Sequence, residues 1–345
     1  MRLRALKLLA ALSMLIALVG VVAIAGWTQL SAYLVRPGPA NEDTVVVLPR
    51  GASLARITAT LSDAGVIDRP WLFRAAVRIL DRDRALKAGE YAFPAAVNPR
   101  TVINMLANGQ TVARRLTVAE GLTVAEIFQL LEQTDGLVGE LPAPPPEGSL
   151  LPETYFYAFG DHRAELVMRM QRAMQDVLAE LWPARAAGLP FAGRDEALTL
   201  ASIVDKETAA AHERDLVAAV FVNRLRRGMR LQADPTVIYG LTEGEGRLGR
   251  ELTRQDWEHA SDYNTYQVDG LPPGPIANPG RAAIEAVLNP AAVDYLYFVA
   301  DGSGGHAFAR TLAEHNRNVA TWRKIKNGEQ PRPQEPAPPK PQPAG

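Results

Sequence analysis

The chain has 345 residues, enough for one large domain or for two to three smaller ones. Its 37 lysines and arginines nearly balance its 38 acids, and no long basic block is present, which gives no electrostatic reason to expect a nucleic-acid partner. The sequence contains no cysteine, which excludes disulfides, zinc–thiolate sites, iron–sulfur clusters and a cysteine nucleophile.

The N-terminus has the pattern of a membrane segment. Three basic residues among the first seven precede an apolar run over residues 8–27, long enough to cross the ~30 Å hydrocarbon layer. The positive flank predicts that residues 1–7 stay in the cytoplasm and that the chain after the helix is exported. A cleaved signal peptide is the alternative, with a small-residue site at residues 23–25. The run is long for such a peptide, and Trp27 and Tyr33 suit the membrane interface.

Two segments share one layout at positions 70 residues apart. Each has a short β-branched strand, a glycine, a candidate helix N-cap two residues later and an amphipathic helix. The glycine and cap are Gly51 and Ser53 in the first copy, and Gly121 and Thr123 in the second. The expected strands are residues 45–48 and 116–118. The likeness is explained either by a structural repeat or by convergence on common strand-to-helix chemistry.

Further elements complete a small α+β module over residues 43–115. Pro70 is expected to open a helix ending near Arg82, and residues 89–93, GEYAF, form a predicted strand. A short helix follows at residues 101–106.

The remaining chain divides into a larger α+β part and a tail. The larger part is predicted over residues 116–326, with a Pro-rich loop or linker at residues 142–148. Residues 327–345 are rich in proline and cannot form a core, which predicts an extended, disordered tail.

One carboxylate is predicted to lie among aliphatic residues of a helix. At about 100° per residue, a single stripe contains Leu200, Ile203, Val204, Glu207 and Ala211. Asp205 and Lys206 are predicted to point outward into solvent. A buried glutamate is disfavoured as the anion, so it can keep a proton near neutrality and deliver it to a leaving group. The alternatives are that the helix ends early, or that Glu207 pairs with Arg214 or Arg224.

Two other chemistries have little support from spacing. His212 and Glu213 could begin an HExxH zinc motif, but the second histidine position is Leu216. Ser202 and Lys206 are four residues apart on a helix, whereas the serine–lysine pattern of penicillin-binding proteins needs a spacing of three. The loops at residues 231–240, 262–280 and 299–308 display amide, hydroxyl and tyrosine groups, which suit a neutral, hydroxyl-rich ligand such as a sugar.

Three stretches of the sequence together resemble a known family. The run LASIVDKETAAAHERDLVAAVFVNRLRRGMRLQADPTVIYGL, followed by DYNTYQVDGLPPGPIANPG and YLYFVADGSGGHAF, resembles the YceG-like endolytic murein transglycosylases, the MltG type. The resemblance extends over the single membrane segment, a LysM-like module at residues 43–115 and LLPETY at residues 150–155. It implies that the catalytic glutamate is the second acid of an E-K-E triplet, here Glu207. Asp205 replaces the first glutamate of that triplet.

The resemblance also implies a mechanism with one carboxylate. Glu207 would protonate the oxygen of the β-1,4 bond between N-acetylmuramic acid and N-acetylglucosamine, then take the proton of the muramyl C6 hydroxyl as it attacks C1. A 1,6-anhydromuramyl end results, and no metal or organic cofactor is required. Substrate positioning and loop order are expected of Glu153, Gln232, Asp234, Thr236, Tyr239, Asn264, Tyr266 and Asn278.

The implied setting is the inner membrane, with a single pass and the catalytic part in the periplasm. The partners would be peptidoglycan glycan strands and the penicillin-binding synthases whose polymerisation is terminated. A non-catalytic, membrane-tethered peptidoglycan-binding protein is the alternative function. Such a binder has no need for an acid among aliphatic residues and would tolerate glutamine in place of Glu207.

Overall fold

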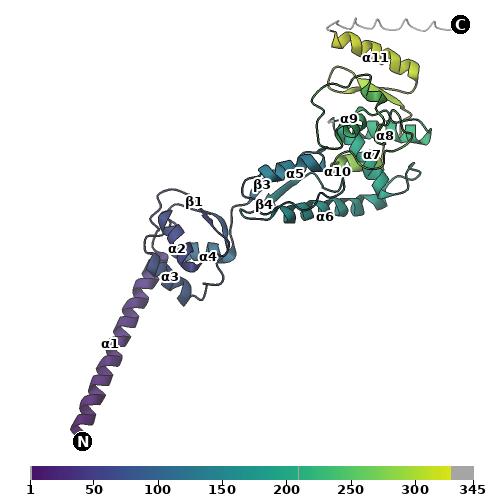
Figure 1. The fold of residues 1–345 in the computed structure, drawn as a ribbon. Coiled ribbons are helices and arrows are strands. Elements are labelled where there is room, and N and C mark those ends of the chain that lie inside the picture. Colours follow the sequence, from purple (N-terminus) through teal and green to yellow (C-terminus); the bar gives the residue numbers. More distant parts are fainter. Residues whose placement is uncertain (1, 209, 328–345) are drawn as a thin grey trace, which may run out of the picture. The chain divides into compact units, whose positions relative to one another are not determined.

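The computed structural model describes residues 2–208 and 210–327, with side chains from residue 10 onward. The fold is α+β, as predicted, and in this described part three two-stranded sheets lie among the helices (Figure 1). The chain forms two compact units. Unit 1 comprises residues 1–116, 135–139 and 156–162, and unit 2 comprises residues 117–134, 140–155 and 163–345. The predicted disordered tail lies, apart from Asn327, outside the described residues.

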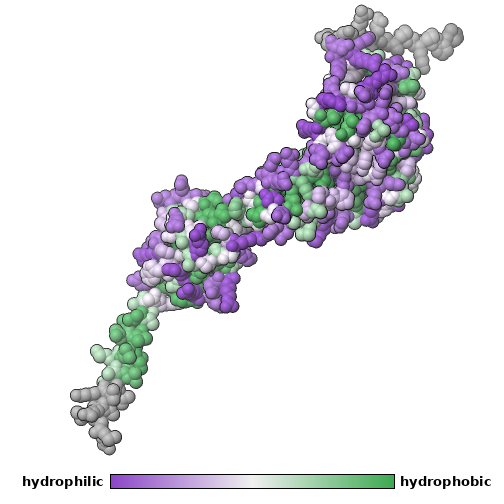
Figure 2. All heavy atoms as spheres, in the orientation of Figure 1, coloured by the Kyte–Doolittle hydropathy of each residue, from purple (hydrophilic) through white to green (hydrophobic). Residues whose placement is uncertain are grey.

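Unit 1 begins with the long helix α1, Arg2–Val35, which is apolar over Ala10–Val35 with a mean hydropathy of 2.3. Figure 2 shows hydrophobic side chains on the described part of α1. This stretch is long and apolar enough to cross a membrane. It runs further than the predicted residues 8–27, because its last turns enter the core of unit 1. Tyr33 is only 2% exposed there, so its predicted place at the membrane interface is wrong.

The rest of unit 1 follows the predicted order of strand, two helices and strand. Its elements are β1 Thr44–Leu48, α2 Leu54–Asp63, α3 Pro70–Ile79, β2 Gly89–Phe93 and α4 Pro99–Asn108. The strands pair antiparallel, with Thr44 opposite Phe93 and Leu48 opposite Gly89. The second helix ends three residues before the predicted Arg82. Helix α4 begins two residues earlier than predicted, directly after its cap Asn98, and ends two residues later.

The two segments with a shared layout both adopt the expected local structure. Gly51 and Gly121 have φ angles of 73° and 75°, a left-handed conformation that glycine adopts at little cost. The Ser53 side chain accepts the Arg56 amide and caps α2. Thr123 forms a full capping box at the start of α5, Val124–Gln133. The second strand, β3, spans Arg114–Thr117 and pairs with β4, Thr154–Tyr157.

Unit 2 is built around α7, Arg194–Glu207, which packs against α8, Arg214–Arg226, α9, Asp234–Thr242, and α10, Arg281–Leu288. Its other elements are α6 Arg163–Leu181, η1 Trp182–Ala184, η2 Asp256–Glu258, β5 Tyr297–Ala300, β6 His306–Ala309 and α11 Leu312–Lys326. The Pro-rich segment at residues 142–148 is a loop, as predicted. Its Glu147 carboxylate accepts the Val124 amide, so the loop is tied to the start of α5.

Candidate active site

Glu207 is the last residue of α7, a helix that is buried on every side. All residues from Ala197 to Val204 are buried, which places this helix in the centre of the unit 2 core. The prediction of a single apolar stripe is therefore too narrow. Ala211 is not part of the helix, because α7 ends at Glu207 and the Thr208 amide closes the last turn on the Val204 carbonyl. Glu207 thus lies at the end of the buried helix, where the backbone leaves the helical conformation.

Asp205 does not point into solvent, so that prediction is wrong. Its side chain is 1% exposed and accepts the Gly280 amide at 3.2 Å, with the Arg214 guanidinium 3.9 Å away. Burial, together with the nearby Glu120 charge, raises the pKa of Asp205 to about 6. Lys206 is exposed, as predicted, and its ammonium group donates to the Gly121 carbonyl. The Asp205 side chain therefore holds the segment at Gly280 beside α7 and is not a solvated surface group.

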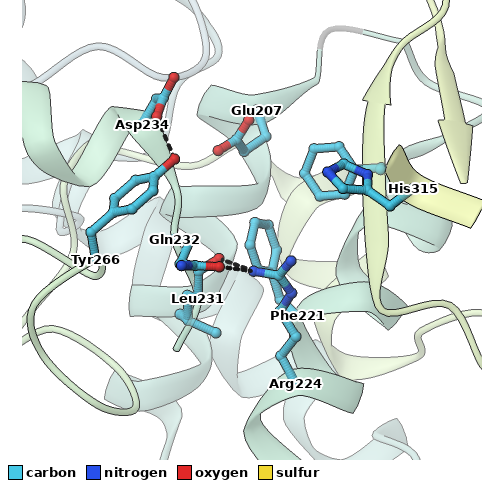
Figure 3. Close-up of a pocket in the computed structure, with 9 residues that line it drawn as sticks. Glu207, Phe221, Arg224, Leu231, Gln232, Asp234, Tyr266 and His315 are labelled. Atoms are coloured by element: carbon cyan, nitrogen blue, oxygen red, sulfur yellow. Dashed lines mark hydrogen bonds between the residues drawn. The ribbon is translucent and has the colours of Figure 1, made fainter. Parts of the chain in front are cut away.

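A pocket of about 360 Å³ opens at the end of α7 (Figure 3). Residues from four helices, one strand and two loops line this pocket: Glu207, Phe221, Arg224, Leu231, Gln232, Asp234, Tyr266, Phe298 and His315. Four of them, Glu207, Gln232, Asp234 and Tyr266, belong to the site predicted from the sequence. The pocket combines two carboxyl groups with amide, phenol, guanidinium and imidazole groups, and two phenylalanine rings form apolar wall.

Glu207 is half-buried, and its side chain lines the pocket. Burial is the largest cause that raises the pKa of Glu207 to about 8; the negative charge of Asp234 adds to this increase, and the Arg224 charge opposes it. The position at the helix C-terminus acts in the same direction, because the unpaired carbonyls there disfavour an anion. At neutral pH the group is a carboxylic acid that can donate its proton into the pocket.

Asp234 begins α9 on another side of the pocket. Its Oδ1 atom accepts two hydrogen bonds, from the Tyr266 hydroxyl at 2.7 Å and from the Trp257 indole at 3.0 Å. Burial and the hydrogen bond to Asp234 raise the pKa of Tyr266 well above its usual range. Tyr266 is therefore a neutral donor held by the carboxylate, and the indole fixes the orientation of Asp234 from η2.

Arg224 forms one wall of the pocket from α8. It is 9% exposed, and its guanidinium donates to the carbonyls of Leu296 at 2.7 Å and Leu231 at 2.8 Å. A longer contact of 3.5 Å reaches the Gln232 side chain (Figure 3). No carboxylate among the described residues lies within ion-pair distance of Arg224, so the predicted alternative of a Glu207–Arg224 salt bridge is not realised.

His315 reaches the pocket from α11, 108 positions after Glu207. Its ring stacks on Tyr297 with centroids 5.2 Å apart, and its Nδ1 atom is buried with no hydrogen-bond partner among the described residues. Burial and the Arg224 charge lower the pKa of His315, which keeps the imidazole neutral near pH 7. No local spacing links this histidine to Glu207, so the sequence alone predicts no role for it.

The other predicted site residues do not line the pocket. Thr236 and Asn264 are fully buried and bond to neighbouring loops, Thr236 to Thr265 and Asn264 to two backbone carbonyls. Asn278 is fully buried as well and holds Leu122, Leu150 and Glu147 together. Tyr239 packs against Tyr263, and Glu153 is exposed. Thr236, Asn264 and Asn278 thus form hydrogen bonds that connect neighbouring segments, and their part in substrate positioning stays a prediction.

The key residues of the serine–lysine and zinc-motif alternatives have other hydrogen-bond partners in the structure. The Ser202 hydroxyl is fully buried, donates to the Thr199 carbonyl and accepts the Ile276 amide, so it is enclosed in the core. Glu213 is paired with His306, whose Nδ1 lies 2.7 Å from the carboxylate. Both residues thus have structural partners outside the pocket.

Comparison with known proteins identifies the family. Residues 46–321 match the YceG-like family. The chain belongs to the YceG-like family. It is 36% identical over 183 residues to an endolytic murein transglycosylase of Bacillus subtilis, an alignment covering 53% of this chain and 49% of that protein. It is 30% identical over 324 residues to one of Streptococcus pneumoniae serotype 2, covering 80% of this chain and 57% of that protein. The chain thus spans about half the length of these curated relatives.

A crystal structure of a YceG-like protein from Listeria monocytogenes is also similar, with 32% identity and a TM-score of 0.48, covering 81% of this chain and 99% of that one. The YceG-like match runs from β1 to α11 and so includes every residue that lines the pocket, from Glu207 to His315.

Proposed function

We propose that the chain is a membrane-anchored endolytic lytic transglycosylase that cuts peptidoglycan glycan strands, with Glu207 as its proton donor and acceptor. The observation that carries the proposal is that one of the two carboxyl groups on the pocket, that of Glu207, has a pKa raised by burial, while most of the other lining groups are polar or aromatic. The name endolytic murein transglycosylase, which both relatives bear, supports the substrate class.

The proposed reaction needs no second carboxylate. Glu207 gives its proton to the glycosidic oxygen while the C1–O bond of N-acetylmuramic acid breaks, and the electron pair stays on that oxygen. The muramyl C6 oxygen then bonds to C1, and its proton returns to Glu207. The products are a 1,6-anhydromuramyl end and an N-acetylglucosamine with a free 4-hydroxyl. Raising the pKa of one carboxyl group to near neutrality suits both proton transfers.

The other pocket groups would position the sugar. Asp234, Tyr266 and Gln232 offer acceptors and donors to hydroxyl and acetamido groups, and the rings of Phe221 and Phe298 exclude water. Keeping water out matters because the internal C6 hydroxyl must attack C1 before water does.

A glycoside hydrolase is the second candidate, because Asp234 shares the pocket with Glu207. In an inverting hydrolase one carboxyl group acts as acid and the other activates water. Mass spectrometry of the products from purified peptidoglycan decides between them: anhydromuramyl ends indicate the lytic reaction and reducing ends indicate hydrolysis. A non-catalytic wall-binding protein would release neither product.

The activity should fall as the pH rises through about 8. Glu207 must begin the reaction protonated, and its pKa is raised from 4.5 to about 8 by burial. The rate of anhydromuramyl formation, measured from pH 5 to pH 9, should therefore have its basic limb near pH 8. A rate that still increases between pH 8 and pH 9 would contradict the role of Glu207 as the acid.

The same group predicts how stability depends on pH. A raised pKa in the folded state contributes stability below the unfolded value of 4.5, and this contribution is lost as the pH rises through about 8. Glutamine cannot ionise, so the Tm of Glu207→Gln relative to the parent should increase between pH 5 and pH 9. The comparison isolates Glu207 from Asp205 and Glu147, whose pKa values burial also raises.

We further propose that α1 anchors the chain in the inner membrane, with residues from about Arg36 onward in the periplasm. The proposal is supported by the apolar stretch Ala10–Val35 and by the basic residues before it. If a reporter is fused after Ile325, one that works only after export should be active, and one that works only in the cytoplasm should be inactive. Recovery of a soluble mature protein that begins near Gly26 would contradict the anchor.

Residues 43–115 of unit 1 are proposed to form the LysM-like module that positions glycan strands. Its β1–α2–α3–β2 order and antiparallel strands support this role. Synthases of the penicillin-binding class are the proposed partners, since termination of a nascent strand requires access to the polymerising enzyme. No nucleic acid, metal or organic cofactor enters the proposed reaction.

A further inference from the structure

Helix α3 in unit 1 carries two parallel rows of side chains, which are exposed except for the half-buried Ala75. Trp71, Ala75 and Ile79 lie four residues apart on one row, and Arg74 and Arg78 form the adjacent row. Trp71 is 63% exposed and Ile79 is 58% exposed. We call these five residues the α3 face. A helix surface with an apolar row beside a basic row is typical of helices that lie at a membrane interface.

The α3 face is not needed to complete the core of unit 1. The opposite side of α3 buries Leu72, Phe73, Ala76 and Val77, so the helix already has a complete core-facing surface. The helix contains no acidic residue, and neither Arg74 nor Arg78 forms an ion pair with any residue that the structure describes. Two unpaired arginines beside an exposed tryptophan and isoleucine leave room for a partner that is both apolar and anionic.

The position of α3 next to α1 indicates which apolar and anionic partner the α3 face contacts. Leu30, Tyr33 and Leu34 at the end of α1 are buried in the same core as the inner side of α3. Trp27, one turn earlier, is 61% exposed, and three residues of helix rise only about 4.5 Å. The apolar stretch of α1 thus passes into unit 1 within about one turn.

The end of α1 is also joined to the start of α3. Arg36 forms an ion pair with Asp68, two residues before Pro70 opens α3, and the two helices are in contact. Figure 1 shows α3 at the end of unit 1 from which α1 emerges. A membrane that contains α1 therefore lies next to α3.

We propose that the α3 face lies in the headgroup layer of the membrane that α1 enters. Trp71 and Ile79 contact the boundary between headgroups and acyl chains, and Arg74 and Arg78 bind the phosphates of anionic lipids. The inference rests on the proposed anchoring by α1. It gives unit 1 a second attachment, which fixes the orientation of this unit on the membrane surface.

Because the chain has no cysteine, single cysteines can report the depth of chosen positions. The full chain would carry Ala75→Cys on the α3 face, labelled with an environment-sensitive dye, in vesicles of phosphatidylcholine and phosphatidylglycerol with doxyl-labelled lipids. Gln110→Cys is the matched control. Gln110 is exposed and precedes Thr111, which packs on Gly89 at the end of the β1–β2 ribbon farther from Gly38 and α1.

The label at position 75 should show a blue-shifted emission and be quenched by lipids labelled near the headgroup, whereas the label at position 110 should show neither. Equal quenching at both positions would overturn the proposal. A third label, at Val21→Cys within α1, tests the anchor separately. If position 21 is quenched deep in the bilayer but position 75 is not, the anchor is correct and the α3 face is wrong; if position 21 is not quenched, both fail.

The charge requirement has its own control. Replacing both arginines, R74E with R78E, should abolish the blue shift at position 75, because each arginine near an anionic leaflet strengthens the contact about fivefold. R56E changes one exposed charge on α2 and should leave the shift unchanged. The shift should also weaken in vesicles of phosphatidylcholine alone. A shift that is insensitive both to R74E with R78E and to phosphatidylglycerol would refute the phosphate contacts.

Discussion

Glu207→Gln should lose nearly all formation of anhydromuramyl ends while the protein stays folded. Glutamine keeps the size and hydrogen-bonding capacity of the side chain but cannot give up or accept the proton. General acid–base catalysis contributes about 10² to 10⁴ to a rate, and the loss should be at the upper end because one group serves both transfers. Product formation from purified peptidoglycan, quantified by mass spectrometry, measures the effect.

The matched control is Glu165→Gln. Glu165 is an exposed glutamate of α6 in the same unit that does not line the pocket, so its amide variant should react at nearly the parent rate. Asp205→Asn is a poor control despite being two residues away. Asp205 is buried and accepts the Gly280 amide, so this variant is expected to lower the Tm as well as the rate. Glu207→Gln with a near-parent rate would remove Glu207 from the mechanism.

Local patterns in the sequence were sufficient to predict much of the fold. Gly51 with Ser53 and Gly121 with Thr123 predicted two helix starts, and both side chains cap their helices in the structure. These features involve residues within one turn of each other, where a glycine conformation and a cap bond decide the geometry. The strand at residues 89–93 was predicted with its observed ends for the same reason.

The helix that carries Glu207 was harder, because burial on all sides removes the amphipathic signal. A stripe analysis assumes that one face meets solvent, whereas α7 is enclosed by α8, α9 and α10. Polar residues on such a helix are buried through tertiary partners. Asp205 meets Gly280 and Arg214, and Ser202 meets Ile276, contacts that depend on segments about 10 to 75 positions away.

The site itself was predicted only in part. Four predicted residues meet in one pocket: Glu207, Gln232 and Asp234 from the family-like run at residues 200–241, and Tyr266 from the run at residues 262–280. Arg224 and His315 join them from α8 and α11, and neither has a local motif. Their positions depend on the packing of β5 against α8 and of α11 against β5 and β6, which cannot be read from the spacing of residues along the chain.

Replacing Arg224 should have the largest effect on stability among the pocket residues. Arg224→Met keeps most of the apolar stem but leaves the carbonyls of Leu231 and Leu296 without their donor. A buried acceptor left unsatisfied costs about 1–3 kcal/mol, so loss of the two bonds should lower the free energy of unfolding by roughly 2–5 kcal/mol. Urea denaturation followed by circular dichroism measures the difference.

The same variant should also change the chemistry of Glu207. The Arg224 charge lowers the pKa of Glu207, so its removal should move the basic limb of the pH–rate profile to higher pH. Arg224→Lys restores the charge without the planar fork, so it should return the limb toward the parent position while remaining less stable. Arg227→Met, an exposed arginine just after α8, is the control and should stay within about 0.5 kcal/mol of the parent. A parent-like unfolding midpoint for Arg224→Met would mean that the guanidinium does not hold the segments before α9 and β5, and an unshifted limb would separate Arg224 from the proton transfer.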